Sequence, residues 1–174
     1  DAIAWIGKAI ESSKAAGAVS KAYVIRAANL SAKMKNYTAA SNFYKELVIT
    51  ENNPDYWHDA LAFFDRSRDF NPEESLDILR LMRATNGLRF QQEYAAYLDS
   101  LSYIGVRYPA EAVSVLDEGF DKGVISRNNV TFNERYNEAK ARLAEDTRTL
   151  PGTIAPAKAS PKPMLSSLTA DSFF

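Results

Sequence analysis

The sequence has no cysteine and a single histidine, His58. The absence of cysteine excludes disulfide bonds, thiolate zinc sites and cysteine nucleophiles, and one histidine leaves little scope for imidazole chemistry. Glycine and proline are scarce, with seven of each, which is too few for a low-complexity or collagen-like chain. Hydrophobic residues, 46% of the total, must therefore stabilise the fold without covalent crosslinks.

Neither sign of charge dominates the chain. It carries 21 basic and 22 acidic residues, for a formal net charge of −1. A protein that coats nucleic acid needs a surplus of Lys and Arg to displace counterions, so we expect no nucleic-acid partner. No window approaches the roughly 18 to 20 consecutive apolar residues of a membrane helix, and we expect no membrane span in this segment.

The sequence contains no motif for a reaction, a metal or a cofactor. Its glycines are scattered, whereas a phosphate-binding loop needs them clustered before a helix, and no nucleophile elbow flanks a serine. His58 lies beside Asp59, but it lacks a second metal ligand of the right type one helical turn away. We therefore predict a protein that is not an enzyme, with no catalytic residue, metal site or cofactor.

What the sequence does contain is a series of helix signals, in which apolar residues recur at helical spacing between polar caps. Helix starts are predicted at Ser20, Asn36, Asn53-Pro54, Asn71-Pro72, Tyr108-Pro109 and Asn128 or Asn129. Helix ends are predicted at Gly17, Pro54, Asn86-Gly87, Gly105 and Gly123. The pattern predicts an all-α fold of eight helices of about 13 to 20 residues, joined by loops short enough to make neighbours antiparallel.

The start signals of corresponding helices recur at a nearly fixed period. Ser20 to Asn53 is 33 residues, Asn36 to Asn71 is 35, and Asn71 to Tyr108 is 37. A period in the mid-thirties built from two helices is typical of a helical solenoid, whose units cannot bury their apolar faces alone. The sequence therefore predicts an α-solenoid of antiparallel helix pairs.

The residues within this period resemble a known family. Ala28, the Asn36-Tyr37 turn, Ala40 and Tyr44 follow one another as small residues, turn and aromatic do in the tetratricopeptide repeat. The second unit is similar in Trp57, Leu61, Phe64 and Asp69-Phe70, and the third in Ala112 and Leu116. The resemblance implies a bacterial repeat protein forming a superhelix, with Phe43, Tyr44, Trp57, Phe64 and Leu116 in its core. On that basis Trp57→Ala should cost roughly 3 to 5 kcal/mol.

The resemblance also divides the chain. Residues 1–150 form the predicted array, with an incomplete repeat at 1–18, repeats at about 19–53, 54–88 and 89–125, and a capping helix at 128–150. The segment 151–163 holds four prolines and is predicted to be an extended linker. Residues 164–174 then begin a further helix. Apolar patterns run to both ends, so we expect a longer chain to have been cut at each.

In a solenoid of this family the first helix of each pair lines the concave groove, so its non-core positions are candidate contacts. Arg26, Asn29 and Lys33 are spaced three and four apart and share one helix face. Two cations and an amide donor would suit a carboxylate or an acidic peptide. The remaining candidate groove residues are His58, Asp59, Arg66 and Gln92.

The sequence thus predicts a non-catalytic scaffold that binds a protein or peptide partner through a groove. Two alternatives stay open. The first is a helical-repeat RNA-binding module, because the RNA-binding pentatricopeptide class shares much of this pattern. The second is the accessory repeat arm of a larger enzyme. The absence of cysteine and the resemblance to bacterial repeat proteins favour the bacterial periplasm over the cytoplasm.

Overall fold

A computed structural model describes residues 2–15, 20–103 and 108–159 of the chain. The regular structure in these ranges consists of eight α-helices, with no strand, which confirms the predicted all-α class. The chain divides into two compact units, Asp1–Leu88 and Arg89–Phe174, and each is described by itself. The division falls where the sequence places the boundary between its second and third repeats.

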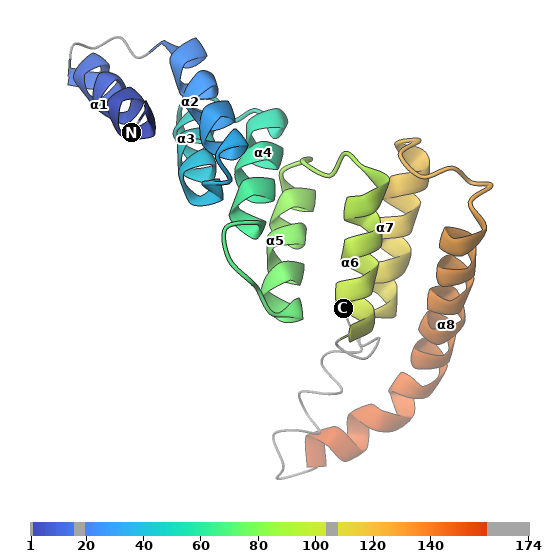
Figure 1. Cartoon of the computed structure of the whole chain (residues 1–174). Coiled ribbons are helices and arrows are strands. Elements are labelled where there is room, and N and C mark those ends of the chain that lie inside the picture. Colours follow the sequence, from blue (N-terminus) through green and yellow to red (C-terminus); the bar gives the residue numbers. More distant parts are fainter. Residues whose placement is uncertain (1, 16–19, 104–107, 160–174) are drawn as a thin grey trace. The chain divides into compact units, whose positions relative to one another are not determined.

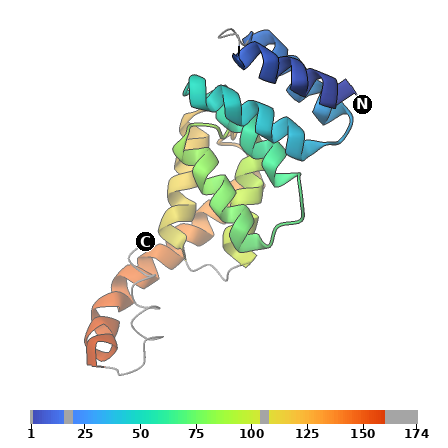
Figure 2. The ribbon, with the colours of Figure 1, turned by 90° about the vertical axis from the view of Figure 1, so that its left-hand side faces the viewer.

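The first unit contains five helices: α1 (Ala2–Ala15), α2 (Lys21–Lys33), α3 (Tyr37–Thr50), α4 (Pro54–Asp65) and α5 (Pro72–Ala84). Each helix packs on the next in sequence, and α1 packs on α2 at one end of the unit (Figures 1 and 2). The most extensive packing joins α3 to α2 on one side and to α4 on the other. The core of this unit therefore lies around α3.

Asparagine side chains start three of these helices. Asn36 and Asn53 each accept a backbone N–H of the first turn, at 3.1 and 2.8 Å. At α5 the bonds run both ways, since the N–H of Glu74 donates to Asn71 Oδ1 at 2.8 Å and the N–H of Asn71 donates to the Glu74 carboxylate at 3.1 Å. These bonds satisfy donors that the first turn leaves unpaired and confirm the predicted starts. Ser20 precedes α2, but its side chain makes no capping bond.

Two residues other than glycine adopt the left-handed backbone conformation after helices of this unit. They are Lys35, with φ of 57°, and Asn86, with φ of 55°. The N–H of Gly87 donates to the carbonyl of Met82 at 2.7 Å, a bond that closes a helix C-terminus. The predicted end at Asn86-Gly87 is thus confirmed, with Asn86 taking the left-handed position. Gly87 has a different role, which is to let this turn lie close to α4. A Cβ there would lie 3.3 Å from the backbone N of His58.

Small residues and aromatic rings form the core where α2, α3 and α4 meet. Ala28 and Ala40 have no exposed surface, in agreement with their predicted role at the helix crossing. The ring of Tyr44 packs against those of Tyr56 and Phe63, with centroid distances of 6.3 and 5.9 Å. The core cluster also includes Ile10, Val24, Ala27, Leu47 and Ala60.

Two aromatic residues of α4 differ from their predicted places. Phe64 is 43% exposed and packs against Phe70 of the following loop, at a centroid distance of 5.2 Å. Trp57 is only half-buried, and its indole N–H donates to Asn52 Oδ1 at 2.8 Å. Successive helical residues are turned by about 100°, so only one of the adjacent residues Tyr56 and Trp57 can point straight into the core. Here that residue is Tyr56, which is 8% exposed.

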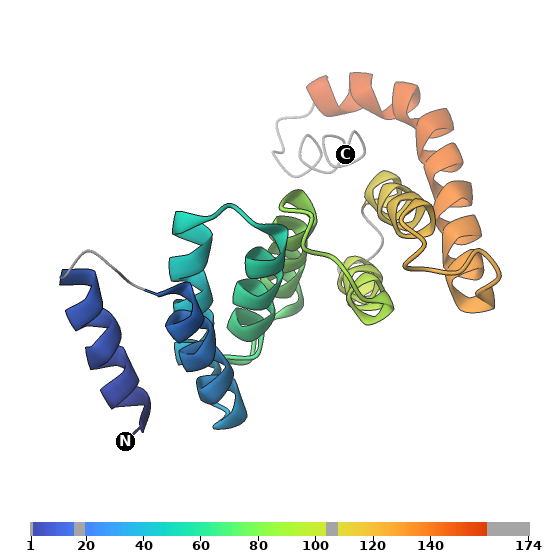
Figure 3. The ribbon, with the colours of Figure 1, turned by 90° about the horizontal axis from the view of Figure 1, so that it is seen from above.

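The second unit contains α6 (Gln91–Tyr103), α7 (Pro109–Asp121) and α8 (Val130–Ala159). The helix α7 packs on both of the others (Figure 3). Gly119 leaves room for the connection after α7 and for α6, because a Cβ there would lie 2.5 Å from the Ile125 side chain and 3.1 Å from the Tyr94 ring. The most deeply buried side chains of the unit are Tyr94, Tyr97, Val115, Leu116 and Ile125.

The ends of α7 agree with prediction. Pro109 occupies its first turn, and Gly123, with φ of 68°, follows its C-terminus. Asn129 caps α8 by accepting the N–H of Phe132 at 3.3 Å. The predicted helix ends at Gly17 and Gly105 lie outside the described residues.

The predicted capping helix does not end near Leu150. It continues to Ala159 through Pro151 and Pro156, so the extended linker predicted from Pro151 is wrong for residues 151–159. Each proline removes a backbone donor from the helix, and α8 changes direction over its second half (Figures 1 and 3). Residues 160–163, and the helix start predicted at 164–174, lie outside the described residues.

Candidate binding surface

The predicted contact residues of the first repeat share one exposed side of α2. Arg26, Asn29 and Lys33 are exposed, and we call this set the α2 face. The opposite side of the helix is anchored in the core by Val24, Ala27, Ala28 and Ser31. Because these four residues fix the rotation of α2 about its axis, they also fix the outward direction of the α2 face.

The cations of the α2 face are not paired with a counter-charge among the described residues. The helix contains no acidic residue, and neither Arg26 nor Lys33 forms an ion pair with any residue that the structure describes. Lys21, at the start of α2, is instead engaged. Its ammonium lies 2.7 Å from the Glu51 carboxylate and 5.0 Å from the Tyr56 ring centroid. The hydrogen bond to Glu51 raises the pKa of Lys21, whereas Arg26 and Lys33 stay available to a ligand.

Two other predicted groove residues are held at the edge of the core. His58 is 8% exposed, and its Nδ1 lies 2.9 Å from Asp59 Oδ1. Burial, and then the negative charge of Asp59, raise the pKa of Tyr44. His58 therefore lies at the edge of the core, where the turn at Gly87 packs against it. Asp59 lies beside it, within hydrogen-bond distance of its ring.

The last two predicted contacts lie elsewhere. Arg66 follows α4 directly and is exposed in the connection to α5. Gln92 is exposed in the first turn of α6, in the second unit. The structure thus brings Arg26, Asn29 and Lys33 together on one helix and keeps the other predicted residues in separate surroundings.

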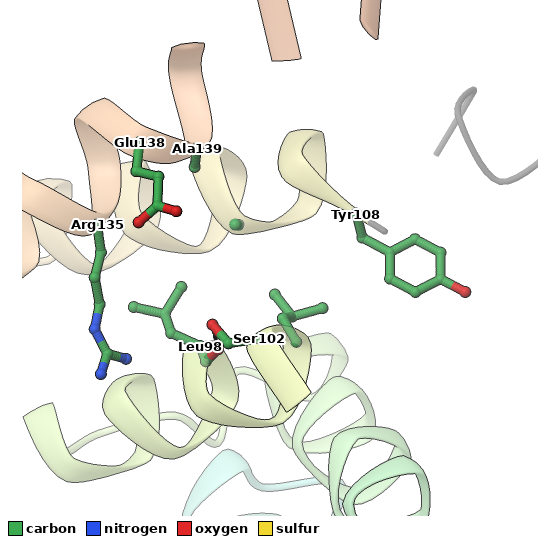
Figure 4. Close-up of a pocket in the computed structure, with 8 residues that line it drawn as sticks. Leu98, Ser102, Tyr108, Arg135, Glu138 and Ala139 are labelled. Carbon is green, nitrogen blue, oxygen red and sulfur yellow. Dashed lines mark hydrogen bonds between the residues drawn. The ribbon is translucent and has the colours of Figure 1, made fainter. Parts of the chain in front are cut away.

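The second unit has a small pocket of about 50 Å³ between α6, α7 and α8 (Figure 4). Arg135 and Glu138 project from α8 toward it, whereas the ring of Tyr108 points away. Its charged groups are already paired, Arg135 with Asp99 at 2.6 Å and Glu138 with Arg142 at 2.9 Å. Its other lining residues are Leu98, Leu101, Ser102, Ala112 and Ala139. The pocket can accept a small apolar group, and its lining includes no histidine or cysteine.

Sequence reasoning missed the hydrogen bonds that link the helices of this unit. The hydroxyl of Tyr97 donates to Glu111 at 2.6 Å, and that of Tyr136 donates to Asp117 at 2.8 Å. The bond to the Asp117 carboxylate raises the pKa of Tyr136. The partners lie 14 and 19 residues apart on different helices, so no local sequence pattern predicts these bonds.

The described part of the chain lacks two features that often indicate function, a cluster of metal-ligating side chains and a membrane-spanning helix. There, no three metal-ligating side chains gather into a group that could hold an ion. Among the same residues, none of the helices is both long and apolar enough to cross a membrane.

Comparison with known proteins gives no relative. No protein-family model, no curated protein and no solved structure matches the chain. The tetratricopeptide resemblance and the bacterial origin therefore stay predictions from the sequence pattern.

Proposed function

We propose that this chain is a non-catalytic interaction module that binds an acidic peptide, or an acidic segment of a partner protein, through the α2 face. One observation carries the proposal. Arg26 and Lys33 lie exposed beside Asn29 and have no acidic partner among the described residues. A ligand with carboxylates supplies the missing counter-charges, and hydrogen bonds between ionised groups are about twice as strong as neutral ones.

The surroundings of the α2 face support an acidic partner. The first 35 residues contain six basic and two acidic side chains, so this part of the chain attracts negative charge and speeds the encounter with an acidic ligand. Two apolar side chains flank the face, Tyr23 at 61% and Met34 at 55% exposed. Tyrosine, methionine and arginine are enriched where proteins bind one another.

A tetratricopeptide-like solenoid is the finer part of the proposal. It is supported by the recurring start signals, by the short connection of residues 34–36 between α2 and α3, and by Ala28 and Ala40 at a tight helix contact. In such an array α2 is the first helix of a pair and faces a concave groove. Arg66 stays a predicted contact of that groove, and Gln92, in the second unit, stays a prediction of the repeat pattern alone. His58 and Asp59 are left out, because His58 is buried and Asp59 lies beside it.

The test is peptide binding measured by fluorescence anisotropy. The probe is a short labelled peptide rich in glutamate, and a peptide with glutamine in place of glutamate serves as its neutral counterpart. We expect the acidic peptide to bind and the neutral one to bind far more weakly, with a strong dependence on salt. The double variant Arg26→Glu and Lys33→Glu should abolish binding and leave helicity unchanged.

A matched control separates the α2 face from net charge. The double variant Lys45→Glu and Lys158→Glu makes the same change of charge at two exposed positions on other helices. It should bind the acidic peptide as the unchanged chain does. Equal binding by the α2 variant, or an equal loss in both variants, would overturn the assignment. Tighter binding of single-stranded RNA than of the peptide at the same salt would favour the RNA-binding alternative.

A further inference from the structure

The acidic residues of the first unit are concentrated in the second half of its sequence. Residues 45–77 contain nine acidic and three basic side chains, opposite to the balance over residues 1–35. The two ends of this stretch of sequence therefore carry charges of opposite sign. Such an arrangement favours attraction between one copy of the chain and another.

The exposed part of this acidic stretch lies where α4 connects to α5. Phe64, Asp65, Asp69 and Glu73 are all exposed there, and we call this set the α4–α5 edge. None of its three carboxylates forms an ion pair with a residue that the structure describes.

The cations of the same connection do not cancel this charge. Arg68 is used locally, with its guanidinium 3.9 Å from the Phe70 ring centroid and 3.1 Å from the Glu74 carboxylate. Arg66 is the other cation there. Its single positive charge does not balance the three carboxylates of Asp65, Asp69 and Glu73, so the connection carries a net negative charge.

The α2 face and the α4–α5 edge complement each other in more than charge. Each sets its charged groups beside exposed apolar side chains, Tyr23 and Met34 next to the α2 face and Phe64 within the edge. An interface with an apolar centre and paired charges at its rim has this composition. Within one copy, neither the cations of the α2 face nor the carboxylates of the edge are paired with described residues, so both remain free to pair between copies.

We propose that a second copy of this chain is a partner of the α2 face, which receives the α4–α5 edge of that copy. This inference rests on the proposed function, because it names the source of the acidic segment. Each contact joins two different surfaces. The assembly closes into a dimer if both contacts form within one pair, and otherwise the contact links copies head to tail.

The test is the mass of the full 174-residue chain by sedimentation velocity over a range of concentration and salt. We expect the average mass to rise with concentration at low salt and to fall back toward the monomer at high salt. A mass equal to that of a monomer at every concentration would overturn the proposal.

Charge-reversal variants test which surfaces meet. Variant one carries Arg26→Glu and Lys33→Glu, and variant two carries Asp69→Lys and Glu73→Lys. Each alone places like charges on both surfaces and should stay monomeric. An equal mixture of the two restores opposite charges at every contact and should associate again. Failure of the mixture to associate, with both variants folded by circular dichroism, would overturn the pairing of these surfaces.

The same variants separate this inference from the proposed function. If the chain binds the glutamate-rich peptide through the α2 face but stays monomeric, self-association is wrong and the proposed function stands. If neither occurs, both are wrong. Association that persists unchanged in variant one overturns the role of the α2 face in it. The variant Lys45→Glu and Lys158→Glu should associate as the unchanged chain does.

Discussion

Two buried serines of the first unit differ in whether their hydroxyl groups are paired. Ser41 Oγ donates to the carbonyl of Ala60 at 2.8 Å and so ties α3 to α4. Ser31, on α2, has no exposed surface, and its Oγ has no hydrogen-bond partner in the described structure. A buried hydroxyl without a partner costs free energy, whereas a paired one contributes to stability.

This difference predicts opposite effects of the same small substitution. Ser31→Ala should leave the free energy of unfolding unchanged or raise it by up to about 1 kcal/mol, because it removes an unpaired group. Ser41→Ala should lower it by about 1 to 2 kcal/mol, because the Ala60 carbonyl loses its donor. Urea denaturation of the two variants measures both. A larger loss for Ser31→Ala than for Ser41→Ala would contradict this account of the core.

The adjacent aromatics of α4 give a second prediction at this scale. Tyr56→Ala should cost about 3 to 5 kcal/mol, as expected for a large buried ring. Trp57→Ala should cost less, because its side chain is only half-buried. This revises the larger loss that the repeat resemblance predicts for Trp57. Urea midpoints of the two variants compare their losses of stability. An equal or greater loss for Trp57→Ala would contradict this placement and support the predicted core position of Trp57.

At the scale of the element, the start of α5 links stability to pH. Bonds from the backbone N–H of Asn71, and then from Arg68, lower the pKa of Glu74. A lowered pKa in the folded state means that the ionised carboxylate stabilises α5 above the pKa of an unfolded glutamate. That contribution is lost as the pH falls through the lowered value.

Glu74→Gln should therefore reduce stability at neutral pH, and its difference from the unchanged chain should shrink as the pH falls below the pKa of an unfolded glutamate and through the lowered pKa of Glu74. Urea midpoints at several pH values measure this convergence. Glu73→Gln is the matched control, because Glu73 is exposed and makes no capping bond. A constant difference between the Glu74→Gln variant and the unchanged chain at all pH values would contradict the ionised cap.

The second half of α8 gives a prediction about helix stability. Pro151 and Pro156 lie inside this helix, where each proline costs about 3 kcal/mol relative to alanine. Because this stretch is already helical, the double variant Pro151→Ala and Pro156→Ala should leave the far-UV helical signal at low temperature nearly unchanged and keep it to a higher temperature. A large gain of helical signal at low temperature by circular dichroism would contradict a helix that continues to Ala159.

Most helix starts could be predicted from the sequence, because a cap acts on its own first turn. Asn36, Asn53 and Asn71 are bonded within three residues of their positions. The end of α8 could not, since the helix continues through Pro151 and Pro156, whose local signals indicate a helix end. Elements with local signals were thus predicted, and the one whose local signals conflict was not.

At the scale of the whole molecule, the sequence located charge more reliably than burial. Arg26, Asn29 and Lys33 were predicted to share one face, because helical spacing alone places them there, and they do. The burial of His58 depends on the turn at Gly87, which packs on it from far along the chain. Sequence spacing does not predict that contact. The shared face of Arg26, Asn29 and Lys33 could therefore be predicted from the sequence, and the burial of His58 could not.

The central claim is that acidic ligands bind at the α2 face, and NMR of the ¹⁵N-labelled full chain tests it most directly. Adding the glutamate-rich peptide should shift backbone signals around Arg26, Asn29 and Lys33 and spare those lining the pocket between α6, α7 and α8. Shifts that cluster at that pocket instead, or no shifts at any peptide concentration, would contradict the account.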